Sequence, residues 1–74
     1  MSYPQSKAAE LIERVIDGIP EHLSPHSEQM YGWGMAELAY ACGLIGDAHY
    51  RKALARLDEA ADKRWKELTG RKAA

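Results

Sequence analysis

Hydrophobic residues recur at helical spacing along the first part of the chain. Positions 8, 11, 12, 15, 16 and 19 are apolar, which places them on one side of a helix, and charged residues fill the other side. Ser2 and Gln5 have the spacing of a capping box. Gly18 suits a left-handed cap, and Pro20 cannot continue the helix. The pattern therefore predicts an amphipathic helix over residues 3–17.

The second segment, residues 25–42, is apolar on nearly all sides. Ser24 and Pro25 suit the N-cap and the first position of a helix. Glu37 is the only formal charge between residues 29 and 46. A helix of this kind needs burial all round, and two short helices offer too little surface to cover it. We therefore expect a second copy to cover it, along a dimer seam formed by Met35, Leu38, Ala39, Cys42 and Ile45.

Glycine residues separate the second helix from a third. Gly43 suits the position after a helix, and Asp47 suits the N-cap of the next one. Apolar residues at positions 50, 54, 57, 61, 65 and 68 predict a third helix over residues 48–68. Gly70 ends this helix, and residues 71–74 form a short basic tail. The tight connection predicts that the two longer helices form a hairpin.

The expected fold is all-α, with one domain over residues 1–74. A short N-terminal helix is followed by a helical hairpin, and two copies pack as a helical-bundle homodimer. The chain has 74 residues and a mass of 8.3 kDa. A chain of this size hides only about 60% of its unfolded surface, and its single cysteine excludes an internal disulfide. Association with a second subunit supplies the missing stability.

Charge is unevenly distributed along the chain. Residues 1–46 carry two basic and six acidic side chains, whereas residues 47–74 carry eight basic and five acidic ones. This layout suits contacts between opposite ends, within one chain or between two antiparallel chains, and equally suits two solvated faces. The net charge of −1 gives no strong field toward nucleic acid or acidic lipid. Without a signal peptide or membrane span, and with one thiol, the expected location is cytoplasmic.

Candidate metal ligands and nucleophiles are few. His22 and His26 lie four positions apart, but Pro25 between them disturbs the helical geometry that a zinc site needs. A third ligand would have to be His49 or Cys42, and exposed loop histidines are the simpler interpretation. Cys42 lies on the seam, where a buried cysteine behaves as a small hydrophobe. We predict a protein that is not an enzyme, with no catalytic residue, no metal and no cofactor.

Glu37 is the one acid in an otherwise apolar helix. We expect it on an exposed strip. The alternative is a buried carboxylate that pairs with Arg51 or Arg56 and fixes the helix register.

Residues 37–44, which read Glu37-Leu38-Ala39-Tyr40-Ala41-Cys42-Gly43-Leu44, resemble the first helix and turn of bacterial repressor-type helix–turn–helix domains. The resemblance covers about twenty residues, 35–54. It implies, as an alternative function, a DNA-binding transcriptional regulator in which Arg51, Lys52 and Arg56 reach the major groove. The chain departs from the family at His49, where an apolar residue is expected, and in the greater length of its third helix.

The expected function is protein binding without catalysis. We expect an adaptor or inhibitor of a larger macromolecule, and small size and composition suggest that a phage or mobile element encodes it. Tyrosine and tryptophan are favoured in interfaces because each combines a large apolar area with a polar group. The predicted contact residues are Tyr31, Trp33, Tyr40 and Trp65. The alternative is that these rings form the core of a small bundle.

Overall fold

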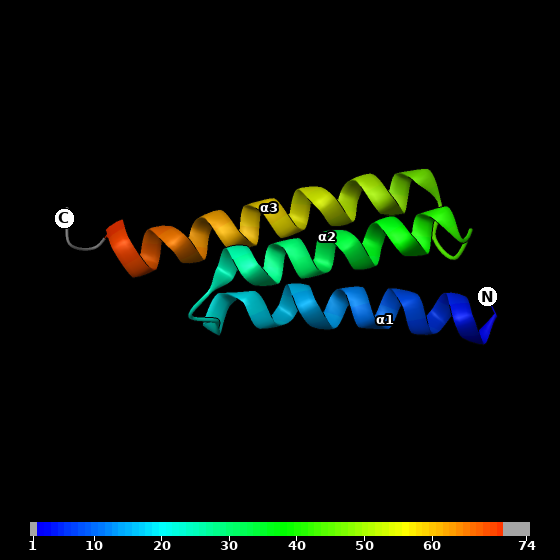
Figure 1. Ribbon diagram of the computed structural model, residues 1–74, viewed down its shortest axis with the longest axis horizontal. Helices are drawn as coiled ribbons and strands as arrows, with labels where there is room; N and C mark the ends of the chain where they lie inside the picture. Colours follow the sequence, from blue (N-terminus) through cyan, green and yellow to red (C-terminus); the bar gives the residue numbers. More distant parts are fainter. Residues whose placement is uncertain (1, 71–74) are drawn as a thin grey trace.

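The computed structural model describes residues 2–70, which form three helices and no strand (Figure 1). The expected all-α, three-helix architecture is confirmed, and every helix ends within one residue of its predicted limit. The predicted basic tail, residues 71–74, lies outside the described residues. Helix α1 spans Tyr3–Gly18, α2 spans Pro25–Ala41, and α3 spans Asp47–Thr69, while a short 3₁₀ helix, η1, covers Ile19–Glu21.

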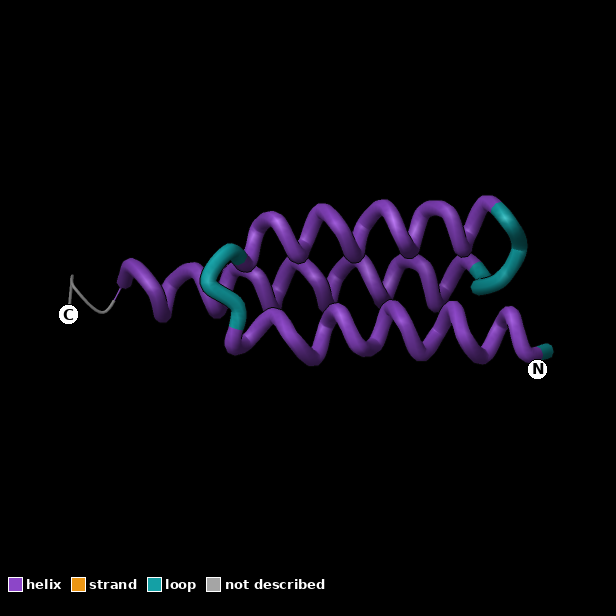
Figure 2. Tube along the Cα trace, turned by 60° about the horizontal axis from the view of Figure 1, so that its bottom comes forward, coloured by secondary structure: helices purple, strands orange, loops and turns teal. Residues whose placement is uncertain are grey.

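The helices lie side by side in an elongated molecule of 47 × 17 × 16 Å (Figures 1 and 2). Helix α2 runs antiparallel to both of its neighbours, so α2 and α3 form the predicted hairpin. Helix α3 has 23 residues and is about 34 Å long, and its last turns project beyond the η1–α2 loop. None of the helices within residues 2–70 combines the length and hydrophobicity that crossing a membrane requires.

The start of α1 has the predicted capping box, whereas its end lacks the predicted left-handed cap. The Gln5 backbone N–H donates to Ser2 Oγ at 3.3 Å, and the Ser2 N–H donates to Gln5 Oε1 at 3.0 Å, which completes the capping box. The predicted left-handed cap at Gly18 is wrong, because its φ is −83°. The chain continues directly into η1, whose first turn accommodates Pro20.

The α2–α3 connection begins with a Schellman motif. Gly43 has a φ of +74°, a region that favours glycine. The Leu44 N–H donates to the Ala39 carbonyl at 2.8 Å, and the Gly43 N–H donates to the Tyr40 carbonyl at 3.0 Å. The predicted N-cap at Asp47 is wrong: Gly46 occupies that position. Asp47 is instead the first residue of α3, where its charge favours the helix dipole.

Close approach of α2 to α3 defines the centre of the core. Leu57 of α3 is fully buried opposite Gly32 of α2. A methyl group added to Gly32 would lie 2.6 Å from Leu57 Cδ2 and 3.1 Å from Val15 Cγ1. Apart from Pro25 at its start, α2 buries only small residues, namely Gly32, Ala36 and Ala39. Its large apolar side chains are therefore left on its flanks and on its outer side.

Candidate functional site

Two of the four predicted contact aromatics pack toward α3. Trp33 Nε1 donates to Asp58 Oδ1 at 3.2 Å. The Tyr40 ring stacks on Tyr50 with centroids 4.5 Å apart, and its hydroxyl donates to Asp47 Oδ1 at 3.1 Å. This hydrogen bond raises the pKa of Tyr40 because it stabilises the protonated phenol. Both rings therefore take part in the hairpin contact.

The other two aromatics lie elsewhere on the molecule. Tyr31 is exposed, and it lies about 200° around α2 from Trp33, because successive helical residues are about 100° apart. Trp65 lies near the C-terminal end of α3, with its ring centroid 5.3 Å from that of His26. The structure therefore does not gather the four aromatics into one surface. The helical spacing of Tyr31 and Trp33 is by itself enough to predict that they lie on opposite sides of α2.

The predicted dimer seam is divided in the same way. Ala39 and Ile45 belong to the chain's own core, so neither is available to a second copy. Met35 is half-buried against that core, whereas Leu38 and Cys42 are exposed. Cys42 is the C-cap residue of α2, beyond its last turn.

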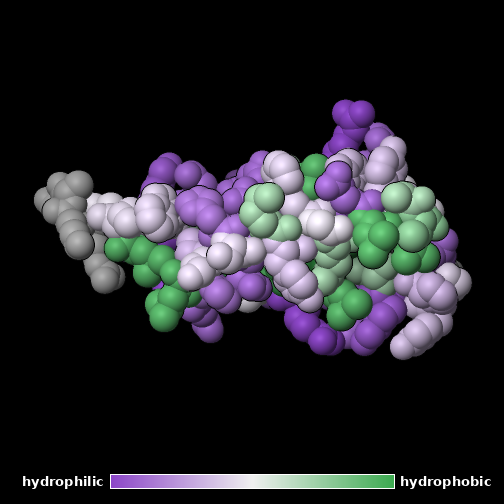
Figure 3. All heavy atoms as spheres, in the orientation of Figure 1, coloured by the Kyte–Doolittle hydropathy of each residue, from purple (hydrophilic) through white to green (hydrophobic). Residues whose placement is uncertain are grey.

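An apolar groove runs between α1 and α2, and we call it the α1–α2 groove. Its volume is about 350 Å³, and Lys7 is the one charged residue in its lining. Hydrophobic side chains gather toward the end of the molecule that carries the N-terminus and the α2–α3 connection (Figure 3). The lining residues are Tyr3, Pro4, Lys7, Ala8, Leu11, Met35, Leu38, Ala39 and Leu44.

Sequence reasoning missed the contribution of α1 to this groove. Leu11 belongs to the apolar stripe that predicts α1. It lies at the edge of that stripe and is only half-buried, whereas its neighbour Ile12 is buried. The helical pattern shows that Leu11 lies at the edge of the apolar stripe. It does not show which part of the neighbouring helix packs against this edge.

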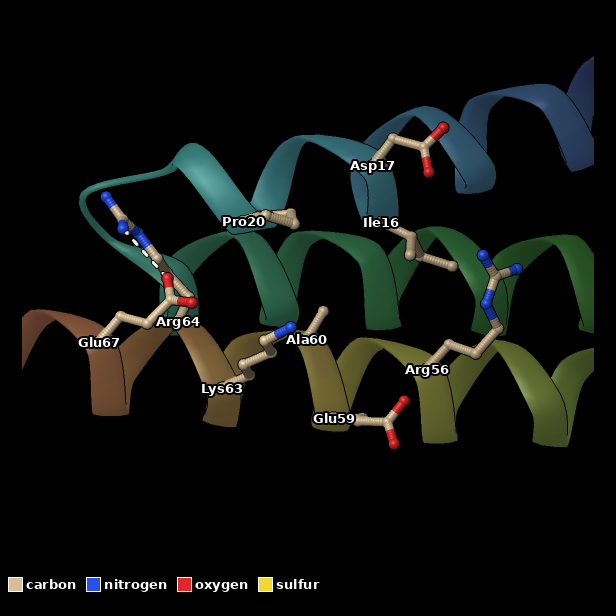
Figure 4. A pocket seen from close by; sticks show the side chains of 9 residues that line it. All are labelled: Ile16, Asp17, Pro20, Arg56, Glu59, Ala60, Lys63, Arg64 and Glu67. Carbon is tan, nitrogen blue, oxygen red and sulfur yellow. Dashed lines mark hydrogen bonds and ion pairs between the residues drawn. The ribbon is translucent and has the colours of Figure 1, made fainter. Parts of the chain in front are cut away.

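A second, larger groove of about 640 Å³ lies between the α1–η1 segment and α3 (Figure 4). Three basic and three acidic residues line it. Arg64 Nε donates to the His22 carbonyl at 2.9 Å, and Arg64 Nη1 lies 3.4 Å from Glu67 Oε1. Because the charges balance and two of the cations, Arg56 and Arg64, already have partners, this groove offers no net attraction to an anionic ligand.

A bidentate ion pair joins α1 to α3 beside this groove. Arg56 donates to both carboxylate oxygens of Glu13, at 2.8 and 2.6 Å. The pair lowers the pKa of Glu13 and raises that of Arg56. The contact links the acidic first half of the chain to the basic second half. The hypothesis of a buried Glu37 paired with Arg51 or Arg56 is wrong, because Glu37 is exposed.

Acidification is expected to weaken the α1–α3 contact through Glu13. The hydrogen bond from Arg56 lowers the pKa of Glu13 below its ordinary value of 4.5. Such a carboxyl contributes stability above its unfolded pKa, and this stability is lost as the pH falls through the folded pKa. Both side chains are more than one-third exposed, so screening limits the contribution to below about 1 kcal/mol. Urea unfolding between pH 6 and 3 should show a larger loss of stability for the wild type than for Glu13→Gln, and equal losses would contradict this.

The hairpin differs from the helix–turn–helix arrangement that residues 37–44 resemble. In that motif the two helices cross at a steep angle, whereas α2 and α3 lie antiparallel and side by side (Figure 1). Arg51 and Lys52 are exposed on α3, with Arg51 Nε 2.9 Å from Asp47 Oδ2, while Arg56 is held by Glu13. The structure therefore gives no observation that favours DNA binding.

The histidines have separate local contacts. His22 Nδ1 accepts from the Ser24 N–H at 3.0 Å, and its Nε2 lies 3.5 Å from Glu28 Oε2. His26 contacts Trp65, and His49 is exposed on α3. Within residues 2–70, no three His, Cys, Asp or Glu side chains are grouped in a way that could hold a metal ion.

A scan against protein-family models and searches of curated proteins and of solved structures found no match to this chain.

Proposed function

We propose that this protein is a non-enzymatic protein-binding module. In this proposal the α1–α2 groove receives apolar side chains from a helix of a larger protein. The observation that carries the proposal is the composition of the groove, which is lined by apolar side chains and a single lysine. An apolar surface of this kind, bordered by polar residues, is typical of an interaction site.

The groove has the form that a helix-in-groove contact needs. Its two walls are neighbouring antiparallel helices, and both are packed on a common core. Leu11 forms part of one wall, and Met35 and Leu38 form part of the other. An amphipathic helix can lie along such a groove and insert residues spaced three or four apart. Because the walls belong to the folded core, little ordering is needed on binding.

Charge at the border of the groove favours an acidic partner. Lys7 Nζ lies 3.5 Å from Glu10 Oε2, and Arg14 Nη2 lies 2.6 Å from the same oxygen. Two cations therefore share one carboxylate, which leaves a net positive charge on this edge. The incoming helix is accordingly expected to carry an acidic residue beside its apolar ones.

A selection from a displayed library of helical peptides tests the proposal. The selected peptides are expected to share an apolar pattern with spacings of three and four, with acidic residues next to it. Binding of the best peptide should weaken at least tenfold in Leu11→Gln, because truncated or polar contacts at the centre of an interface typically cost more than 1 kcal/mol. Fluorescence anisotropy with the labelled peptide measures the affinity.

Ala55→Gln is the matched control, because Ala55 is exposed on α3 and does not line the groove. Its affinity for the selected peptide should equal that of the wild type. The proposal fails if Leu11→Gln binds as tightly as the control, or if the selected peptides share no apolar pattern.

A further inference from the structure

The outer side of α2 is a second apolar surface, and we call it the α2 outer face. Met30, Tyr31 and Leu38 expose 62%, 59% and 66% of their surface there. Exposed small residues lie between them, and Glu37 is the only charged residue on the face. Leu38 also borders the α1–α2 groove, but the other residues lie outside that groove. The members of the face are Ser27, Met30, Tyr31, Gly34, Glu37, Leu38 and Ala41.

Gly34 lies at the middle of this face, and the chain's own fold does not require it. Glycine is the least favoured helix residue after proline. Gly32 is explained by its contact with Leu57, but a methyl group added to Gly34 would meet nothing within 4 Å. Gly34 does not have a positive φ either. A glycine at this position would instead allow another chain to approach the backbone of α2 closely.

The face is self-complementary about Gly34. Met30 and Leu38 lie four positions before and after it, and Ser27 and Ala41 lie seven positions before and after it. A two-fold rotation at Gly34 therefore places large residues against large ones and small against small. The same rotation brings Tyr31 to the level of Glu37 of the partner subunit along the helix axis. Neither side chain has a hydrogen-bond partner among residues 2–70 of its own chain.

The available area is sufficient for a small interface. With about 200 Å² for a full side chain, the three large residues offer on the order of 400 Å² in each copy. Two copies, together with the backbone at Gly34 and the stem of Glu37, approach the roughly 1,000 Å² that a specific interface needs.

We propose that a second copy of this chain packs on the α2 outer face, antiparallel, with the two-fold axis at Gly34. This proposal goes beyond the predicted dimer seam, since it places Ala39 and Ile45 in the core of each subunit. It leaves Leu11 and the α1 wall of the α1–α2 groove exposed to a larger partner, and Leu38 is the residue that the two surfaces share.

Sedimentation equilibrium of the purified chain tests the association. The wild type is expected to show twice the chain mass at high concentration. Gly34→Leu should be monomeric with unchanged or increased helicity, because the added side chain has open space in the isolated fold. Met30→Glu should also be monomeric. Ala55→Leu introduces the same side chain at an exposed position of α3, and this variant should remain a dimer.

Spin labels on the native Cys42 test the orientation. Cys42 lies eight residues from Gly34, so the antiparallel arrangement places the two Cys42 positions about 24 Å apart along the helix axis. A parallel arrangement places them at the helix separation, about 8–10 Å. The proposal is overturned by a wild-type monomer at about 1 mM, by a Gly34→Leu dimer, or by the short label distance.

Discussion

Leu57→Ala is expected to leave a large fraction of the protein unfolded at room temperature. Leu57 has no exposed surface and lies against Gly32, where α3 packs on α2. Truncating a fully buried leucine costs about 2–5 kcal/mol, because the removed atoms leave a cavity that relaxes only partly. A single core of this size supplies only about 3–5 kcal/mol in total. Circular dichroism should therefore show reduced helicity at 25 °C and a melting temperature lower by at least about 10 °C.

Leu54→Ala provides the matched comparison for this experiment. Leu54 is on the same helix and loses the same atoms, but it is only half-buried against the core. The free energy of unfolding should fall clearly less in Leu54→Ala than in Leu57→Ala. If the two variants melt at the same temperature, Leu57 is not the centre of the core.

The helices could be predicted because their signals are local. The capping box at Ser2 and the left-handed turn at Gly43 depend on residues within one or two turns. The apolar stripe of α1 likewise has a single interpretation, since charged residues fill the opposite side. For such segments the pattern decides the structure before any tertiary contact is known.

The orientation of α2 could not be predicted in the same way. Its sequence contains a seam through Leu38, a stripe of small residues through Ala36 and a stripe of aromatics through Trp33, and each could face the core. The structure buries the small stripe because this allows Leu57 of α3 to pack against Gly32. That gain depends on a residue 25 positions away, so the pattern of α2 alone does not contain it.

The candidate site was partly hidden for the same reason. Trp33 was expected in an interface, but its indole N–H finds Asp58, which is 25 residues further along the chain. Leu11 belongs to the apolar stripe of α1, but it lies at the edge of that stripe and is only half-buried. Met35 and Leu38 were predicted in a dimer seam, whereas the groove they form with α1 depends on the tertiary arrangement.

Gly32→Ala is expected to lower the free energy of unfolding of the wild type but to raise that of Leu57→Ala. In the wild type the added methyl group lies 2.6 Å from Leu57 Cδ2, and overpacking of this kind costs about 1–3 kcal/mol. In the Leu57→Ala background the same methyl group fills part of the cavity and also gains up to about 1 kcal/mol of helix propensity. Urea unfolding in the presence of a stabilising osmolyte keeps all four proteins of the cycle measurable.

Gly34→Ala separates the packing effect at Gly32 from helix propensity. Its added methyl group meets nothing within 4 Å in the isolated chain, so in dilute solution it should stabilise both backgrounds by up to about 1 kcal/mol. If Gly32→Ala destabilises the wild type and Gly34→Ala stabilises it, the close contact between α2 and α3 lies at Gly32. If Gly32→Ala stabilises the wild type as Gly34→Ala does, then α2 and α3 are not held together by the contact of Gly32 with Leu57, and the burial of the small-residue face of α2 needs another cause.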